Sequence, residues 1–434
     1  MDFAYSEKSL DLQRRVRDFM DAHVIPRHAQ FKEEEARGTF EISFMDDLKA
    51  LAKEEGLWNM FLPGLGADEP GVGLSVLDYA PLAEIMGRLM WASEVFNCSA
   101  PDTGNMEILH MFGTPEQKET WLKPLLNGEI RSAFSMTEPD SASSDATNIA
   151  TVMRREGDEY VINGRKWFST GAASPRCKLS IVMGKTDPDN PDRHRQQSMI
   201  LVPLDAPGVK IVRNTPVMNH VDYESHCEIA FENVRVPVSN LLGEEGSGFA
   251  IAQARLGPGR IHHCMRSIGQ AELAHQMMVE RSLERKTFGR YLHEHGMMQE
   301  KIARNRMEID QARLLVLKAA WLIDQFGVKA ARTEVSMIKV VVPEMQQRVV
   351  DRAMQTFGGM GVTPDTPLPN LWTMARSLRL ADGPDEVHMR TLARMEVRKA
   401  QKGAMDTHRF MTLPDRANER DMREGREGWS PAKR

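Results

Sequence analysis

The sequence predicts an α+β protein with an N-terminal all-helical domain, a small β-barrel or sheet in the middle, and a C-terminal four-helix bundle. Three observations lead to this class. Apolar residues recur at helical spacing through the first 130 residues, short β-type runs follow without intervening helices, and helical spacing returns from Phe249. We expect the boundaries 1–130, 131–245 and 246–402, followed by a charged tail over 403–434.

The N-terminal part is predicted to be helical from its apolar spacing. Leu12, Val16 and Phe19 lie on one helical face ahead of Pro26. Thr114-Pro115-Glu116-Gln117 has the composition of a capping box with proline at the first helical position. A helix is therefore expected to begin there.

The middle part is predicted to hold short strands. Tyr160-Val161-Ile162 and Lys166-Trp167-Phe168 flank Asn163-Gly164, which predicts a two-residue hairpin turn. Further β-type runs are separated by turn residues rather than by helices, so a small antiparallel sheet or barrel fits better than a Rossmann domain. These runs are 178–183, 198–203, 209–212 and 227–231.

The C-terminal part is predicted to be a bundle of long helices. Four helical patterns with short links cover Ile261–Arg285, His295–Phe326, Ala330–Phe357 and Pro384–Lys402. The tail that follows carries many charges and little apolar spacing. We expect it to be disordered alone or to lie on a neighbouring molecule.

Composition excludes several classes of protein. Of the 434 residues, 41% are hydrophobic and 27% are charged, as in a folded globular chain rather than a disordered one. Lys and Arg number 56 against 61 Asp and Glu, a net charge of −5, and both signs are scattered. Because a nucleic-acid binder usually carries a basic stripe, we expect no nucleic-acid partner.

The cysteines and the N-terminus indicate the compartment. Cys98, Cys177, Cys227 and Cys264 lack the paired spacing of a zinc site or a redox dithiol, which favours buried reduced thiols. The first residues do not resemble a signal peptide, and no apolar run is long enough to cross a bilayer. We therefore expect a cytoplasmic protein without membrane insertion.

Common cofactor and metal motifs do not match. Gly257-Pro258-Gly259 is followed by Arg260, so the dinucleotide fingerprint fails. His293-Glu294-His295 and the pair His262-His263 lack the spacing of a zinc helix. Solvated or hydrogen-bonded histidines are favoured there, and no metal site is predicted.

Two segments of the β part are suited to a flat heterocycle. Residues 134–145 combine small hydroxyls with a proline turn, and backbone amides and Thr137 there could hydrogen-bond the edge of a ring; a solvated loop is the alternative. Trp167-Phe168-Ser169 adds an aromatic wall and a hydroxyl, although sheet packing alone would explain Trp167.

Three segments of the helical part are suited to a phosphate or a base. Residues 285–290 offer a cation for a pyrophosphate, or a basic helix end. Residues 355–361 contain three glycines that would let the backbone approach a phosphate, or would form a helix C-cap. Residues 381–388 have the composition of a helix start, for which Asp382 would be the cap.

The order of these five segments resembles the acyl-CoA dehydrogenase family of flavoproteins, from Ser6 to Lys402. Residues 134–145 are similar to the family's flavin-binding T-E-P segment, and Trp167-Phe168-Ser169 to its flavin-shielding strand. Arg285-Lys286-Thr287-Phe288-Gly289 is similar to its R-K-T-F-G signature. Each motif alone is weakly specific, but jointly they are highly specific.

The resemblance implies FAD as cofactor, an acyl-CoA as substrate, an electron-transfer flavoprotein as acceptor, and a homodimer or homotetramer. The isoalloxazine ring would lie between the β part and the bundle, on Met136, Thr137, Trp167 and Ser169. The adenylate side would be held by Gln355, Gly358 and Gly359, and by Arg285 and Thr287 of a second subunit. The other implied cofactor contacts are Phe134, Phe168, Phe288, His295 and Glu386.

The same resemblance implies the catalytic groups. Ala381-Asp382-Gly383-Pro384 replaces the usual tyrosine-glutamate-glycine-threonine, which makes Asp382 the candidate base, one methylene shorter. We expect an apolar pocket to raise its pKa. Arg260 matches an arginine of the active-site helix and would support the base, while Gly259 stands where some relatives carry an alternative glutamate. Ser144 and Gly383 are the implied substrate contacts.

The motif Asp-Gly-Pro-Asp-Glu-Val-His is similar to that of one subgroup, whose animal members are fused behind a kinase-like module and act on long or 4-hydroxylated acyl-CoAs. Two alternatives stay open. The first is a flavin oxidase that uses oxygen, of the acyl-CoA oxidase or nitroalkane oxidase type. The second is a non-catalytic flavoprotein that binds nucleic acid, against which the net charge of −5 and the retained acid argue.

Overall fold

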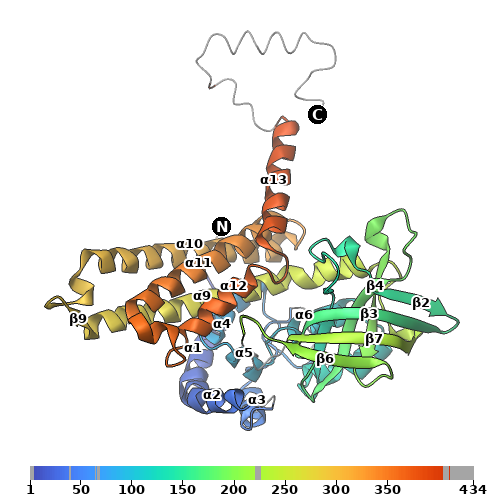
Figure 1. Cartoon of the computed structure of the whole chain (residues 1–434), viewed down its shortest axis with the longest axis horizontal. Coiled ribbons are helices and arrows are strands. Elements are labelled where there is room, and N and C mark those ends of the chain that lie inside the picture. Colours follow the sequence, from blue (N-terminus) through green and yellow to red (C-terminus); the bar gives the residue numbers. More distant parts are fainter. Residues whose placement is uncertain are drawn as a thin grey trace.

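The computed structural model describes residues 4–38, 41–63, 65, 69–219, 226–403 and 410. The predicted tail therefore lies outside the described residues, apart from 403 and 410. Figure 1 shows a sheet at one side of the molecule and long helices extending away from it, with shorter N-terminal helices beside both. The α+β class and the order helical, β, helical are confirmed.

The N-terminal helices begin where the sequence provides caps. The Ser6 side chain accepts a hydrogen bond from the Ser9 amide, and Thr114 forms the predicted capping box with Gln117. The helices are α1 Glu7–Phe19, α2 His28–Ala36, α3 Met45–Glu54, α4 Val76–Gly87, α5 Ala92–Val95, α6 Asp102–Phe112, α7 Pro115–Gln117 and α8 Lys123–Leu126, with π-helical turns at Met20–Val24 and Lys118–Leu122.

The middle part is one eight-stranded sheet in the order β6-β7-β3-β2-β4-β5-β8, with β1 paired to β4. It is mixed rather than purely antiparallel, because β1 runs parallel to β4. The strands are β1 Arg131–Ser135, β2 Val152–Glu156, β3 Glu159–Thr170, β4 Cys177–Lys185, β5 Gln197–Pro203, β6 Val209–Thr215, β7 His226–Pro237 and β8 Leu241–Leu242.

The hairpin turn predicted at Asn163-Gly164 is wrong. Strand β3 runs through both residues, and the chain reverses before it, at Gly157-Asp158. Gly164 is explained by a close approach, since a Cβ there would lie 2.4 Å from the Thr151 hydroxyl oxygen. The dipeptide marks an irregularity in the pairing of β3 with β7 rather than a turn.

The C-terminal part contains the four predicted long helices. They are α9 Gly248–Glu284, α10 Gly296–Phe326, α11 Arg332–Phe357 and α13 Asp385–Gln401, with the unpredicted α12 Leu368–Leu378 between the last two. Helix α9 starts earlier than expected and continues through the Gly257-Pro258-Gly259 segment. A small hairpin of β9 Lys286–Thr287 and β10 Arg290–Tyr291 follows α9.

Helices α4 and α9 cross at two glycines. A Cβ at Gly87 would lie 2.4 Å from the Arg266 Cα, and a Cβ at Gly269 would lie 2.1 Å from the Glu84 carbonyl oxygen. The two backbones therefore touch with no side chain between them. This contact sits within one apolar core that runs continuously from α1 through α4 and α9 to α12.

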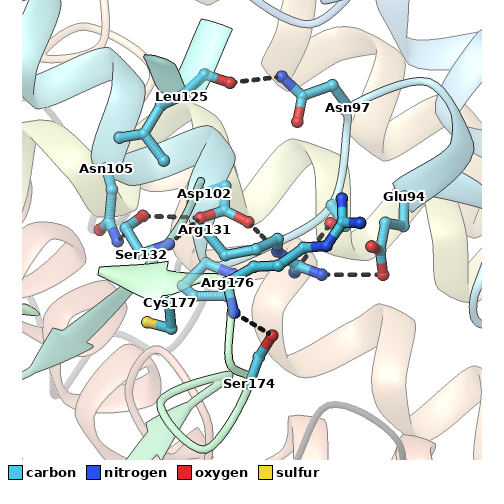
Figure 2. A network of polar contacts seen from close by, with 12 residues as sticks. Glu94, Asn97, Asp102, Asn105, Leu125, Arg131, Ser132, Ser174, Arg176 and Cys177 are labelled. Atoms are coloured by element: carbon cyan, nitrogen blue, oxygen red, sulfur yellow. Dashed lines mark hydrogen bonds and ion pairs between the residues drawn. The ribbon is translucent and has the colours of Figure 1, made fainter. Parts of the chain in front are cut away.

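A buried polar network joins the N-terminal helices to the first strand (Figure 2). Asp102, at the start of α6, accepts hydrogen bonds from Arg131 Nε at 2.6 Å and from the Ser132 amide at 2.7 Å. Arg131 also pairs with Glu94 at 2.8 Å, and Glu94 with Lys49 at 2.7 Å. The network fixes β1 on the helices and so positions the T-E-P segment that follows it.

Candidate active site

Asp382 occupies a tight turn between α12 and α13. Its φ is +55° and that of Gly383 is +101°, both in the left-handed region, and a Cβ at Gly383 would lie 2.9 Å from His388 Nε2. The N-cap position of α13 is Pro384. The Asp382 carboxylate instead points to α9, where its Oδ2 lies 3.2 Å from His263 Nε2. The helix-cap interpretation of Asp382 is therefore wrong.

Three cationic or polar side chains hold this turn by its carbonyl groups. Arg260 on α9 donates to the Asp382 carbonyl at 3.1 Å, and His388 Nε2 lies 3.3 Å from the same oxygen. Lys339 on α11, fully buried, donates to the Ala381 and Leu378 carbonyls at 2.8 and 2.6 Å. These contacts stabilise a backbone conformation that a non-glycine residue seldom adopts.

The electrostatics of Asp382 differ from the expectation of a raised pKa. Burial alone would raise the pKa of Asp382, but the His263 hydrogen bond and the charges of Lys339 and Arg255 outweigh it and hold the pKa well below its ordinary value. Arg255 lies with its guanidinium 4.1 Å from the centre of the Phe134 ring. The surroundings of Asp382 therefore favour the ionised form of its carboxylate.

The structure brings together the two segments predicted to contact a flavin ring. Thr137 Oγ1 donates to the Trp167 carbonyl at 2.9 Å, and the Trp167 amide donates to the Thr137 carbonyl at 3.1 Å. Met136, Thr137 and Trp167 are half-buried, and Phe168 is 43% exposed with a φ of +53°. An accessible aromatic edge beside partly buried polar groups fits a flat heterocycle.

A buried ion pair that the sequence analysis missed holds the T-E-P segment. Lys166 Nζ, fully buried, donates to Glu138 and to the Met136 carbonyl, both at 2.8 Å. Glu138 also accepts from the Thr151 hydroxyl at 2.6 Å and from the Ala150 amide at 2.7 Å. Burial raises the pKa of Glu138, but the Lys166 charge and the hydrogen bonds lower it to about 2; burial lowers the pKa of Lys166 to about 8.

One of the predicted flavin contacts, Ser169, is placed differently from the expectation. Ser169 is fully buried, and its Oγ lies 2.8 Å from Ser135 Oγ, so its hydroxyl faces the interior of the sheet rather than the surface. The pairing of β3 with β7 is irregular between Lys166 and Ser169, which changes the alternation of faces. Ser144 is exposed in its loop, and Glu386 is exposed on the first turn of α13.

The predicted adenylate contacts gather at the other end of the bundle. Arg281 of α9 lies 5.3 Å from the centre of the Phe357 ring, which places residues 355–359 beside the Arg285 hairpin. His295 Nε2 lies 3.3 Å from the Thr287 carbonyl, and Phe288 is 95% exposed. Figure 1 shows β9 at the end of the bundle farthest from the sheet. Within one chain, this group of residues therefore lies at the opposite end of the bundle from the sheet that contains Trp167. Gln355 and Arg285 belong to the same end of the bundle.

The reason for a glycine differs between the two positions of the adenylate group, Gly358 and Gly359. Gly358 has a φ of +67° at the end of α11, as a C-cap requires. A Cβ at Gly359 would meet no atom within 4 Å, whereas one at Gly361 would lie 2.3 Å from the Met354 carbonyl oxygen. Packing within the chain explains Gly361 but not Gly359, which fits the approach of another group.

The residues around Asp382 that the sequence analysis missed are His263, Lys339 and Arg255. A weak signal for His263 was available, since it follows Arg260 by three positions and so shares its helical face. Lys339 and Arg255 carry no local signal.

Three further findings concern metals, thiols and membranes. Within the described ranges, no group of three His, Cys, Asp or Glu side chains is arranged to hold a metal ion. All four cysteines are buried and none forms a disulfide. No helix of the described part is both long enough and apolar enough to span a bilayer.

Comparison with known families matches nearly the whole chain. Residues 6–129, 133–234 and 246–396 match the N-terminal, middle and C-terminal domains of acyl-CoA dehydrogenase. "Probable acyl-CoA dehydrogenase FadE2" of Mycobacterium tuberculosis is 57% identical over 402 residues, covering 92% of this chain and 97% of the relative.

Two further relatives agree. "Acyl-CoA dehydrogenase family member 11" of Gallus gallus is 51% identical over 403 residues, which are 91% of this chain; this chain spans about half of that relative, 51%. A solved Mycobacterium abscessus protein, itself named only provisionally as an acyl-CoA dehydrogenase, is 50% identical with a TM-score of 0.87, covering 91% of this chain and 99% of its own. The chain therefore belongs to the acyl-CoA dehydrogenase family of FAD-dependent flavoenzymes.

Proposed function

We propose that the protein desaturates an acyl-CoA thioester between its α and β carbons, with Asp382 removing the α proton. The observation that carries this proposal is the Asp382 carboxylate, which caps no helix, points to His263 and lies in a strained turn held by groups from α9, α11 and α13. Bound FAD would supply the acceptor for the β hydride. We propose an electron-transfer flavoprotein as the next electron acceptor.

Different residues of the chain have different roles in this reaction. Asp382 accepts the proton, and Arg260 holds its carbonyl so that the turn keeps its shape. The backbone amide of Asp382 is the donor that this chain offers to the thioester oxygen as negative charge develops there. We place Ser144 and Gly383 on the substrate side.

We further propose that two subunits complete each cofactor site. The segments with Met136, Thr137 and Trp167 would hold the isoalloxazine ring in one subunit. Because residues 355–359 lie beside the Arg285 hairpin, both would come from the second subunit, together with the exposed Phe288. We also place the protein in a reducing, cytoplasmic compartment, since none of its four cysteines forms a disulfide.

The purified protein is expected to be yellow and to hold FAD without a covalent bond, because the ring-binding and adenylate-binding segments are all present. An absorption spectrum, followed by anaerobic mixing with acyl-CoAs of different chain lengths, tests this. Loss of flavin absorbance with at least one acyl-CoA supports the dehydrogenase. A colourless protein that cannot be reconstituted with FAD would contradict it, and stoichiometric peroxide in air would favour the oxidase.

Arg285→Ala is expected to lower FAD retention at least tenfold, because the guanidinium would lose its charge-assisted contact with the pyrophosphate. The measurement is the FAD-to-protein ratio after gel filtration, with light scattering for the oligomeric state. Arg304→Ala is the matched control, since Arg304 is exposed on α10 and pairs there with Glu300. Equal retention in both variants, or a monomer that holds FAD normally, would exclude the shared site.

A further inference from the structure

His263 lies directly against the proposed base. It is on α9, one turn after Arg260, and its Nε2 is 3.2 Å from Asp382 Oδ2. Only 27% of the His263 side chain and 19% of the Asp382 side chain are exposed. The pair is therefore largely shielded from water, where a hydrogen bond to a carboxylate is stronger than on the surface.

Arg266 determines which nitrogen of His263 carries the proton. Its Nη2 lies 3.1 Å from His263 Nδ1. A guanidinium can only donate, so Nδ1 must accept and the ring proton must sit on Nε2, facing Asp382. A second proton on Nδ1 would point at the Arg266 cation. The ring is therefore fixed as the neutral Nε2–H form.

Arg266 is itself anchored to the rest of the fold. Its Nη1 donates to the Cys98 carbonyl at 3.3 Å, between α5 and α6. Its backbone lies at the crossing with α4, where Gly87 leaves no room for a side chain. The orientation of the His263 ring is thus tied to the packing of α9 on the N-terminal helices.

We propose that His263 is a positioning residue for Asp382, donating its Nε2 proton to Oδ2 and leaving Oδ1 as the oxygen that receives the substrate proton. The proposal rests on the proposed function, in which Asp382 is the base. It goes beyond that function by assigning a role to an α9 histidine that never touches the reacting atoms. The hydrogen bond both orients the carboxylate and favours its ionised form.

Several charged or titratable groups surround the pair. His263 is faced by Asp382 from the α12–α13 turn, by Arg266 from its own helix, and by Lys339 from α11. Burial and the Arg266 charge outweigh Asp382 and leave the pKa of His263 below its ordinary value. The other groups that act on Asp382 or its turn are Arg255 and Arg260 of α9 and His388 of α13.

The experiment compares His263→Leu, which removes the donor, with His263→Gln, which can place an amide N–H near the former Nε2. His275→Leu is the matched control, because His275 is a partly buried histidine on the same helix whose charged neighbours are Arg306, Glu272 and Asp310. Asp382→Asn is measured in parallel. The readouts are FAD content, the pH dependence of the single-turnover bleaching rate, and nitrogen-15 spectra of histidine-labelled holoenzyme.

In His263→Leu we expect the acid limb of the bleaching profile to move to higher pH, because Asp382 would bind its proton about 10- to 100-fold more tightly without the donor. The plateau rate should fall about tenfold because the carboxylate is no longer held. His263→Gln should restore much of both, and His275→Leu should match the wild type. In the wild-type spectrum at pH 7, His263 should be a neutral ring protonated at Nε2.

The proposal is overturned if Asp382→Asn abolishes bleaching while His263→Leu keeps the wild-type acid limb and plateau. It is also overturned by an Nδ1–H or doubly protonated His263 at pH 7, a measurement that needs no turnover. Normal bleaching in Asp382→Asn would instead remove Asp382 as the base, and the positioning role with it. If His263→Leu does not fold, the Gln variant and the spectra still decide the matter.

Discussion

Asp382→Asn should leave a yellow, fully folded protein whose flavin acyl-CoA no longer bleaches. The substitution keeps the size of the side chain but removes the oxygen that would accept the α proton. Loss of a general base typically slows a reaction by about 10² to 10⁴-fold, so the bleaching rate should fall within this range. Stopped-flow absorbance at saturating acyl-CoA, with FAD content and melting temperature measured alongside, gives the result.

Two companion variants make the Asp382 result specific. Asp382→Glu should retain part of the activity, since it keeps a carboxylate at a different length. Glu396→Gln on α13 is the matched control and should be unchanged, because Glu396 is exposed and forms a surface ion pair with Lys399. Near-normal bleaching in the Asn variant would contradict Asp382 as the base and direct attention to Glu386, the next acid in the α13 first turn that faces solvent.

Lys166→Met should destabilise the protein by about 3–5 kcal/mol, because it leaves the buried Glu138 carboxylate without its cation. Urea unfolding followed by tryptophan fluorescence would measure the loss. Glu138→Gln should cost a similar amount by leaving the buried ammonium of Lys166 unpaired. Since both changes break one contact, the double variant should lose less than the sum of the two single losses.

The same ion pair predicts how stability changes in acid. The pKa of Glu138 is lowered to about 2 in the folded state, so the folded protein binds fewer protons there than the unfolded chain does. Its contribution is fully present above the ordinary glutamate pKa and is lost as the pH falls from there toward about 2. The wild type should therefore lose more stability across this interval than Glu138→Gln. Parallel acid sensitivity in both proteins, or additive single losses, would contradict the role of the pair.

The sequence was sufficient for elements whose pattern is local and long. The apolar spacing of α10 and α11 continues for many turns, and the structure contains both helices close to the predicted bounds. Helix α12 was not predicted. Pro364, Pro367 and Pro369 lie around its start, and proline disfavours a helical conformation in the residue that precedes it. Asn163-Gly164 was misinterpreted because a turn and a strand irregularity favour the same residues, and the Thr151 side chain that requires glycine comes from another segment.

For the candidate site too, local sequence patterns predicted some features and not others. The motif around Asp382 was recognisable only through a family resemblance, since its local composition favours a helix cap. The groups that act on Asp382 belong to residues far from it in the sequence, namely His263, Lys339 and Arg255. No local sequence pattern predicts that they lie close to Asp382. The expected direction of the Asp382 pKa was wrong for this reason, because burial could be anticipated from the sequence but the surrounding cations could not.

The crossing of α4 and α9 through Gly87 and Gly269 also bears on how the chain folds. A core that passes without interruption from α1 to α12 gives the first 130 residues no apolar interior of their own. The helical parts at the two ends of the sequence should therefore gain and lose structure together, as one cooperative unit interrupted in the chain by a sheet with a second core. We therefore expect the N-terminal helices to become stable only once α9 has been synthesised and can pack against them.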